Sequence, residues 1–410
     1  MSDNTTDDDG GGIYNDGWLA KATIDDSQIV NNRAGFRGGG FYSEDSAVVT
    51  FTNSIINNNE AGRGGGVYNG YHSTSTFNEI TISGNSAGRG GGIGNTFGVV
   101  IVNNTIIDHN TATVQGGGID GNSNITVIDS TISNNTGALI GGGINSGGVL
   151  TVSHTTVMSN VATTNGGGIN SGAACGRVMI YDSIVSHNQA QGTGTFDGGG
   201  GILIESKGII ENSVISHNAS GNLGGGIHIS FTGSSGCPGT AILTNTTVSG
   251  NSAKNGGGIA SRTSTFTTLN SNTVVENTAS EAGGGIYSGS TVTVRNSLVA
   301  QNNAPTGPDC RNTVTSEDYN LFQNLNDCTL TGVTAHNILA QDPLLDPLQN
   351  NGGSTLTHAL LLDSPAIDAG DDASCPTEDQ RGVARPQWGQ CDIGAFEWQG
   401  YLVDLPLVIK

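Results

Sequence analysis

Apolar residues recur along most of the chain at three fixed positions of a repeat that begins with Gly-Gly-Gly. In the copy that starts at residue 116, these positions are Ile119, Val127 and Ile132. Most of them hold β-branched residues, and apolar and polar residues alternate locally with a period of two, which is typical of strands. The eleven triplets begin at residues 10, 38, 64, 90, 116, 141, 166, 199, 224, 256 and 283. The pattern therefore predicts a set of short strands in every repeat.

The spacing of the triplets sets the architecture. Successive copies start 25 to 33 residues apart, and most lie at the short end of that range, which is too short for the common helical repeats. We expect each copy to form one coil of three strands, with coils stacked about 4.8 Å apart through backbone hydrogen bonds. Parallel crossovers are almost always right-handed. The prediction is an all-β, right-handed parallel β-helix of about eleven coils.

An asparagine lies three residues after the third apolar position in every copy. A side-chain amide both donates and accepts, so amides in register on stacked coils would form a continuous ladder. We expect this structural role for Asn32, Asn59, Asn85, Asn110, Asn135, Asn160, Asn188, Asn218, Asn251, Asn277 and Asn302. The glycine triplet is expected to form a tight bend with positive φ. A nucleotide-binding loop is disfavoured because it needs a following helix.

Composition excludes several classes of function. Charged residues make up 12 % of the chain, there are 66 glycines, and the formal net charge is −21. Such a chain offers no basic surface for nucleic acid or for an anionic membrane. No stretch of about 18 apolar residues is present, so no transmembrane segment is predicted. Residues 1–12 lack the features of a secretory signal, so a secreted or cell-surface protein would have lost its signal from this chain.

The repeats stop near residue 304, and the sequence changes character. We expect a parallel β-helix domain over 1–304, a separate module over 305–400 and an apolar tail over 401–410. The module would cover the open end of the solenoid and so block edge-to-edge aggregation. The tail would be either a strand packed on the module or a sorting signal. It is too short to span a bilayer.

Six cysteines suit an oxidising compartment. Two local pairs are plausible within residues 305–400, Cys310 with Cys328 and Cys375 with Cys391. Cys175 and Cys237 lie in corresponding loops of coils that another coil separates. Stacking alone would place them about 10 Å apart, beyond the roughly 7 Å limit for a disulfide. Both loops are longer than their neighbours, so we expect them to lean together and pair.

The sequence resembles two known families. Ile-x-x-Asn followed by Gly-Gly-Gly-Ile, as in 132–144, is similar to the repeat of the polymorphic outer-membrane proteins, which share the right-handed β-helix fold of pectate lyases. Residues 364–371 (Ser-Pro-Ala-Ile-Asp-Ala-Gly-Asp) and 391–397 (Cys-Asp-Ile-Gly-Ala-Phe-Glu) resemble the choice-of-anchor domain of secreted bacterial β-helix proteins. The resemblance implies export and surface attachment, and it implies no reaction.

One column of polar residues is a weak catalytic candidate. Asp129, His154 and Asp182 occupy the same position on three consecutive coils, with the outer carboxylates about 9–10 Å apart. That separation is near the upper limit for an inverting glycosidase. The column is polar in every copy, however, so we interpret it as a turn position. His187 and His217 are adjacent in another column, but no third ligand accompanies them. We expect neither a metal nor a cofactor.

Two rows on the first three coils form the best candidate for a binding surface. The arginine row precedes the triplets, and the tyrosine row is expected to point outward beside it. Arginines could grip an anionic polymer, and aromatic rings could carry sugars. Nearby acids such as Glu60 could instead neutralise the arginines, and stacked rings stabilise strands by themselves. The rows are Arg37, Arg63 and Arg89, and Tyr14, Tyr42 and Tyr68.

Two functional hypotheses follow. The favoured one is a non-catalytic surface protein that acts in adhesion, as a spacer or in an extracellular assembly, with a polysaccharide or another surface protein as its partner. The alternative is a carbohydrate-active enzyme, a polysaccharide lyase or glycoside hydrolase of the pectate-lyase type. We favour the first because no compact cluster of Asp, Glu, Arg and Lys is evident. The first coil, around Ile13 and Ile24, is expected to expose unpaired backbone groups and to mediate self-association.

Overall fold

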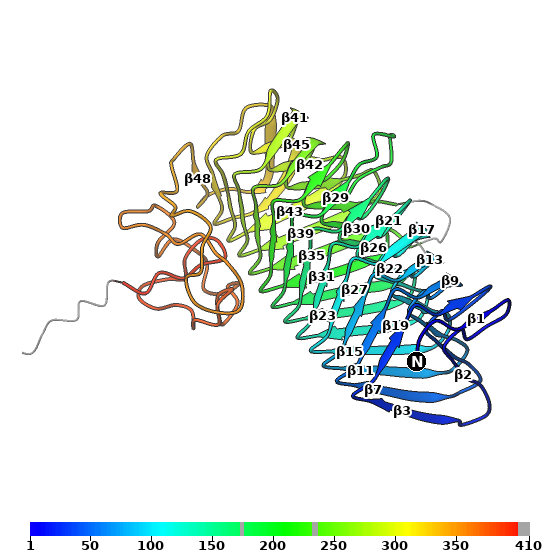
Figure 1. Ribbon diagram of the computed structural model, residues 1–410. Helices are drawn as coiled ribbons and strands as arrows, with labels where there is room; N and C mark the ends of the chain where they lie inside the picture. The colour runs from blue at the N-terminus through cyan, green and yellow to red at the C-terminus, as the bar shows by residue number, and fades with distance from the viewer. Residues whose placement is uncertain (173–175, 232–236, 401–410) are drawn as a thin grey trace, which may run out of the picture.

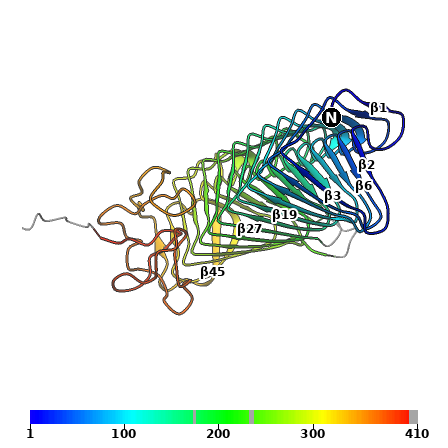
Figure 2. The same ribbon diagram turned by 60° about the horizontal axis from the view of Figure 1, so that its bottom comes forward.

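The computed structural model describes residues 1–172, 176–231 and 237–400. These residues form an all-β parallel solenoid of about 12 turns, in which the coils stack into a rod (Figures 1 and 2). Within the described ranges every regular element is a strand. No helix in that part of the chain is long and apolar enough to cross a membrane. The predicted fold class is confirmed.

A typical coil has four strands, one more than predicted. The third coil contains β9 (Glu60–Arg63), β10 (Val67–Asn69), β11 (Thr74–Asn78) and β12 (Thr81–Ser83). The extra strand directly follows the ladder asparagine of each coil, and its inward-facing residue is usually alanine. A single methyl group gives little apolar signal, so this strand was missed. The inward column comprises Ala34, Ala61, Ala87, Ala112, Ala162, Ala190, Ala253 and Ala279.

All strands pair in parallel and in register, so equivalent residues of successive coils touch. Val67 of β10 pairs with Phe41 of β6 (Phe41–Ser43) on one side and with Ile93 of β14 (Ile93–Asn95) on the other. The rings of Phe51 and Phe77 stack 5.1 Å apart in the interior. The buried side chains form one continuous apolar core along the rod, which is the main stabilising contribution of such a fold.

The predicted asparagines form a ladder with a direction. The Nδ2 group of Asn135 donates to Oδ1 of Asn160 in the next coil (3.0 Å) and to the carbonyl of Ile107 in the previous one (2.9 Å). The Oδ1 atom of Asn135 accepts in turn from Asn110 (3.0 Å). Every predicted member from Asn32 onward donates toward the C-terminal side in this way.

Two further residues complete the ladder at its ends. Asn4 donates to Oδ1 of Asn32 (2.7 Å), and it lies six residues before its glycine triplet, as Asn32 does. At the other end Asn302 donates to Oδ1 of Asp309 (3.0 Å), whose Oδ2 accepts from the backbone of Asn324 (2.6 Å). A carboxylate only accepts, and the last position of a ladder needs only an acceptor. Burial raises the pKa of Asp309 to about 6, although these hydrogen bonds oppose the shift.

This raised pKa predicts a pH dependence of stability. Asp309 holds its proton more tightly in the folded than in the unfolded chain, so its contribution favours folding at acid pH. The contribution is complete below about pH 4 and is lost as the pH rises through about 6. We expect the difference in unfolding free energy between the wild type and Asp309→Asn to change by up to about 3 kcal/mol between pH 3.5 and pH 7.5. Urea unfolding at both pH values measures it, and a constant difference would contradict the assignment.

The three glycines of a triplet serve two different purposes. Only the first has positive φ, as at Gly116 (66°), so the expected left-handed bend is confined to that position. A Cβ atom on Gly117 would lie 2.4 Å from the carbonyl oxygen of Gly142, and one on Gly118 would lie 2.7 Å from that of Gly143. The second and third glycines are therefore required because successive coils approach each other too closely for a side chain.

Strand pairing continues beyond the predicted boundary at residue 304. β45 (Cys310–Glu317) pairs with β42 (Ile286–Ser288) and β43 (Thr291–Arg295), and β46 (Leu321–Phe322) pairs with β44 (Leu298–Ala300). β47 (Cys328–Val333) and β48 (Ile338–Leu339) extend these rows. The predicted disulfide Cys310–Cys328 links β45 to β47. This turn lacks the glycine triplet, so the repeat pattern could not reveal it.

The remaining residues, 341–400, are loops that lie beside the last coils (Figures 1 and 2). They pack on the outer face of the row that contains β36 (Thr247–Ser249), β40 (Thr273–Val275) and β44. These contacts are with the side of the rod, whereas a cap over its end was expected. The predicted Cys375–Cys391 disulfide lies in this module. A second apolar cluster joins the two parts: Val275, Leu298, Ala300, Leu321, Leu360, Ala366, Ile393 and Phe396.

The first coil is partly covered by the residues that precede its triplet. β1 (Thr5–Thr6) pairs with β5 (Arg33–Ala34), and Ser2 bridges to Val30. β2 (Ile13–Asn15) and β3 (Lys21–Asp25) each pair with a strand on one side only. The expected open edge is present, because β1, β2 and β3 each pair with a strand on one side only. Cys175 and the tail 401–410 lie outside the described residues, as does the predicted pairing of Cys175 with Cys237.

Candidate functional site

Two outward columns that flank the glycine triplets line a groove at the N-terminal part of the rod. The residue before each triplet forms one column, in which Arg63 lies in register between Arg37 and Arg89, and Gln115 follows. The fifth residue from the start of each triplet forms the other. In register along the rod, this second column runs Tyr14, Tyr42, Tyr68, Gly94, Asp120, Asn145.

The tyrosine row is stacked as expected but is not an open platform. The rings of Tyr14 and Tyr42 lie 4.9 Å apart, and those of Tyr42 and Tyr68 lie 5.6 Å apart. Tyr42 and Tyr68 are only 1 % and 2 % exposed, whereas Tyr14 is 56 % exposed. The guanidinium of Arg37 lies 5.1 Å and 5.2 Å from the Tyr42 and Tyr68 ring centres. The expectation of three outward rings therefore holds only for Tyr14.

Arg37 differs from the other two arginines. It forms ion pairs with Asp9 (2.8 Å) and Glu44 (3.3 Å) and is half-buried. Arg63 and Arg89 are exposed, and neither forms an ion pair with a described residue. Glu60, the acid considered as their neutralising partner, pairs instead with Arg33 (3.5 Å). Two guanidiniums are therefore available to bind an anionic ligand.

The groove consists of two adjoining cavities. A wider one of about 530 Å³ is lined on its N-terminal side by Asp8 and Asp9. A narrower one of about 150 Å³ extends to Asp120 and Asn145. The charge of the groove thus changes along the rod from acidic on the first coil to basic at its middle. Both cavities share Arg63, Tyr68 and Thr96.

The narrower cavity exists because Gly94 interrupts the second column. Glycine leaves the position between Tyr68 and Asp120 without a side chain. A Cβ atom there would lie 2.9 Å from the backbone nitrogen of Gly64 and 3.6 Å from the Tyr68 ring. The opening is therefore bounded by an aromatic wall on one side and a carboxylate on the other, with Arg63 and Arg89 among its lining residues.

Asp120 ends a second, shorter amide ladder. Its Oδ1 accepts from Gln115 (3.0 Å) and from Asn145 (2.7 Å), and Oδ1 of Asn145 accepts in turn from Asn170 (2.7 Å). Its Oδ2 accepts no hydrogen bond from a described residue. Asp120 keeps some exposed surface but lies deep among its neighbours. This burial raises the pKa of Asp120, against the lowering effect of the two amides and of Arg89 and Arg63.

The predicted catalytic column is a row of turns. Asp129, His154 and Asp182 all have positive φ, between 47° and 48°. The Nε2 atom of His154 lies 4.0 Å from Oδ2 of Asp182. None of the three lines either cavity of the groove. The arrangement agrees with the interpretation of this column as a turn position.

The histidine pair stacks on the rod surface. The rings of His187 and His217 lie 5.0 Å apart and nearly parallel. Burial and the neighbouring His187 lower the pKa of His217. In the part of the chain that the structure describes, no three side chains of His, Cys, Asp or Glu are placed to hold a metal ion.

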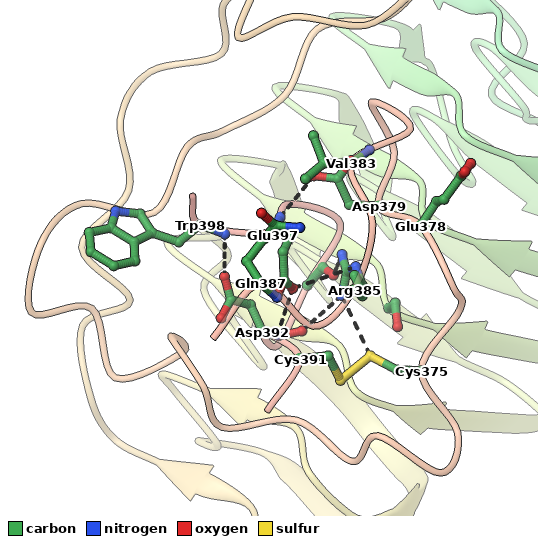
Figure 3. A network of polar contacts seen from close by, with 12 residues as sticks. Cys375, Glu378, Asp379, Val383, Arg385, Gln387, Cys391, Asp392, Glu397 and Trp398 are labelled. Atoms are coloured by element: carbon green, nitrogen blue, oxygen red, sulfur yellow. Dashed lines mark hydrogen bonds and ion pairs between the residues drawn. A yellow bond between two sulfur atoms is a disulfide. The ribbon is translucent and has the colours of Figure 1, made fainter. Parts of the chain in front are cut away.

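The C-terminal module contains a buried network of charged groups (Figure 3). Arg385 donates to the backbone carbonyl of Asp392 (2.9 Å) and lies 3.8 Å from the Glu397 carboxylate. Burial and the nearby Glu397 raise the pKa of Asp392 to about 7. Each oxygen of Asp392 and Glu397 accepts a backbone N–H group, from Asp368, Trp398, Gln387 and Asp392. These carboxylates therefore fix loops that have no strand pairing, and they present no free oxygen for chemistry.

The sequence could have revealed Asp120 and Gly94. Both follow the three tyrosines of the second column, at the point where its residues cease to be aromatic. Asp120 is also the only aspartate directly after a Gly-Gly-Gly-Ile pattern. The predicted arginine row and Tyr68 of the predicted tyrosine row line this groove. In a stacked fold, a residue that differs in type from its column is informative about a possible site. It creates a gap or a charge whose neighbours are known from the register.

A comparison with protein families agrees with the fold. A family model described as "Right handed beta helix region" matches residues 9–184. Among solved structures, the pectate lyase Pel9A is similar over 93 % of this chain and 86 % of its own, with 15 % sequence identity and a TM-score of 0.41. No curated protein matches. Most of the solenoid's N-terminal half thus matches a right-handed β-helix model.

Proposed function

We propose that this protein is a secreted or cell-surface β-solenoid that binds an acidic extracellular polysaccharide without cleaving it, and so acts in adhesion or in an extracellular assembly. The observation that carries the proposal is a pair of arginines, Arg63 and Arg89, that form no ion pair with a described residue and line a cavity that Tyr68 also lines. Guanidinium groups form strong, geometrically specific hydrogen bonds with carboxylates and sulfates.

The narrower cavity favours binding over hydrolysis. Glycoside hydrolysis ordinarily requires two carboxyl groups that flank the bond. Asp120 is the only acidic residue among those that line this cavity. One oxygen of Asp120 is already engaged by Gln115 and Asn145. The specific observation in favour of the enzymatic alternative is the free Oδ2 of Asp120 together with its raised pKa, which would suit a general acid or base.

The location of the protein is part of the proposal. The two disulfides suit an oxidising compartment. Residues 364–371 and 391–397 resemble the choice-of-anchor domain, and the repeats resemble those of the polymorphic outer-membrane proteins. We infer attachment to a cell surface through the C-terminal module, separate from a β-helix domain that binds the ligand.

Self-association through the N-terminal coils is a further part of the proposal. β2 and β3 are paired on one side only. Trp18 and Leu19, between these strands, are 85 % and 60 % exposed. Unpaired strand edges with apolar neighbours favour contact with another chain.

Binding to defined polymers tests the proposed function. We expect polygalacturonate or dextran sulfate to bind the protein in a salt-sensitive manner, and neutral dextran not to bind. Replacing Arg63 and Arg89 together by Gln should weaken binding at least about tenfold, because each charge-assisted hydrogen bond contributes about 1.5–3 kcal/mol. Biolayer interferometry with the immobilised polymers measures the affinity.

A matched control separates the groove from general charge. Arg177 of β27 (Arg177–Tyr181) is also exposed and forms no ion pair with a described residue. Arg177→Gln should leave binding unchanged. Equal losses in both variants would contradict the assignment of the groove. Release of shortened or unsaturated products that stops in Asp120→Asn would replace the binding role with the enzymatic one.

A further inference from the structure

The second outward column contains another position where a small residue interrupts it. Beyond Asn145 the column continues through Asn170, Leu203, His228, Ala260 and Tyr287. Ala260 lies between a histidine and a tyrosine, as Gly94 lies between a tyrosine and an aspartate. A cavity of about 290 Å³ lies on these coils, lined by Asn222, Leu223, Asn255, Arg262, Tyr287 and their neighbours.

His228 is buried without any hydrogen-bond partner. It is 0 % exposed, and neither Nδ1 nor Nε2 has a partner among the described residues. Leaving a buried polar group unpaired costs about 1–3 kcal/mol, so such a group in a folded protein calls for an explanation. Burial, with a contribution from Arg262, lowers the pKa of His228 to about 3. The ring is therefore neutral at pH 7 and offers one donor and one acceptor.

Arg262 is a cation that lacks an ion-pair partner in a chain with a formal net charge of −21. It forms no ion pair with a described carboxylate, and its Nη1 atom is buried without a hydrogen-bond partner. Its guanidinium carbon lies 4.0 Å from the ring centre of Phe196, which holds the group over the ring. Asp197, which follows Phe196 in the sequence, forms no ion pair with Arg262. Its carboxylate accepts a hydrogen bond from the backbone of Gly194 (2.8 Å).

Phe196 comes from an insertion in the repeat. The triplets at 166 and 199 are 33 residues apart, in contrast to the usual 25 or 26. Five of the eight additional residues lie between β29 (Gln189–Ala190) and β30 (Ile202–Ile204), and this segment places Phe196, which is 62 % exposed, against the arginine. The insertion thus contributes Thr195 to the lining of this cavity and the Phe196 ring to the contact with Arg262.

We propose that the cavity at Arg262 is a second binding site for the acidic group of a glycan. In this site the guanidinium binds a carboxylate or sulfate, Tyr287 borders the sugar and Phe196 supports the guanidinium. This second proposal rests on the proposed function only because both sites are assigned the same class of ligand, an acidic glycan. Leu223 and Asn255 continue the column of Arg37, Arg63 and Arg89, so both sites lie on the same face of the rod.

The spacing of the two sites suits one polymer chain. Gly94 and Ala260 are six coils apart in register, which corresponds to about 29 Å at ~4.8 Å per coil. A polysaccharide laid along the rod axis would reach both sites, whereas a trisaccharide would reach one. Simultaneous occupation raises the overall affinity through effective concentration, without any new contact.

Isothermal titration calorimetry with short oligosaccharides tests the second site. Trigalacturonate supplies carboxylates and sulfated maltotriose supplies sulfates, so the two arms distinguish the sources of the anion. We expect two molecules to bind per chain in the wild type and one in Arg262→Gln. Long polygalacturonate should bind the wild type at least about tenfold more tightly than the trisaccharide, and this gain should disappear in Arg262→Gln.

Further variants keep the two proposals separable. The variant with Arg63→Gln and Arg89→Gln should retain one trisaccharide, bound at Arg262, and Phe196→Ala should weaken that remaining site. Arg177→Gln should bind two. A wild type that binds one molecule, lost on changing Arg63 and Arg89 but kept in Arg262→Gln, overturns the second site and leaves the groove. A single molecule lost only in Arg262→Gln supports the second site and overturns the groove. No binding of either probe overturns both.

Discussion

Gly117→Ala is expected to be among the most damaging single substitutions in the rod. A Cβ atom at this position would lie 2.4 Å from the carbonyl oxygen of Gly142 and 2.6 Å from the backbone of Thr136, so two neighbouring segments of backbone would have to move. Backbone atoms cannot rotate away as a side chain does, so the cost is expected at or above the upper end of the about 1–3 kcal/mol that is typical of overpacking. We expect a large loss of soluble protein and a lowered midpoint of urea unfolding followed by circular dichroism.

A glycine outside the triplets provides the matched control. Gly147 has ordinary φ, and a Cβ there would be no closer than 3.6 Å to the atoms of Asn122. Gly147→Ala should change the unfolding free energy by no more than about 0.5 kcal/mol. If the two variants had the same midpoint, coil-to-coil contact would not be the reason for the second glycine.

Asn135→Ala is expected to destabilise the middle of the rod. The substitution removes the bonds from Asn135 to Asn160 and to the carbonyl of Ile107. It also leaves the backbone nitrogen of Asn110 without its acceptor and removes one of the three acceptors of the Asn110 side chain. Each buried group left unpaired costs about 1–3 kcal/mol. We expect a loss of at least about 3 kcal/mol, seen as a lower urea midpoint.

The exposed Asn124 of β19 (Asn124–Ile128) is a suitable comparison, because it forms no hydrogen bond with a described side chain. Asn124→Ala should have little effect. Asn4→Ala should cost less than Asn135→Ala, because Asn4 donates to Asn32 but has no earlier rung that donates to it. Equal losses at Asn4 and Asn135 would argue against a ladder whose rungs depend on both neighbours.

Much of the fold could be predicted because, in a stacked repeat, every coil requires the same residue types at the same positions. Three apolar columns and one asparagine column recur in eleven copies, so chance variation at one residue such as Phe77 does not hide the pattern. The alanine strand and the last turn escaped prediction for opposite reasons. Ala61 and its equivalents are too weakly apolar to register, and β45 to β48 lack the triplet that aligned the other coils.

The candidate sites were harder to predict. The arginine row was visible, but Arg37 pairs with Asp9 of the preceding coil and with Glu44 of its own coil, while Arg63 pairs with no described residue. The burial of Tyr42 and Tyr68 follows from stacking and from Arg37 above them. The cavity at Arg262 is lined in part by Thr195 of an insertion, whose Phe196 contacts the arginine, and the sequence alone does not say where an insertion will fold.

The direction of the asparagine ladder has a consequence for how such a protein can change in length. Every internal rung accepts from one side and donates to the other, so its two faces are complementary to any other internal rung. A whole coil could therefore be duplicated or deleted in the middle of the rod and the hydrogen bonds would close again. Asp309, which accepts without donating onward to another rung, ends the series, so variation in length is expected between the ends and not at this terminus.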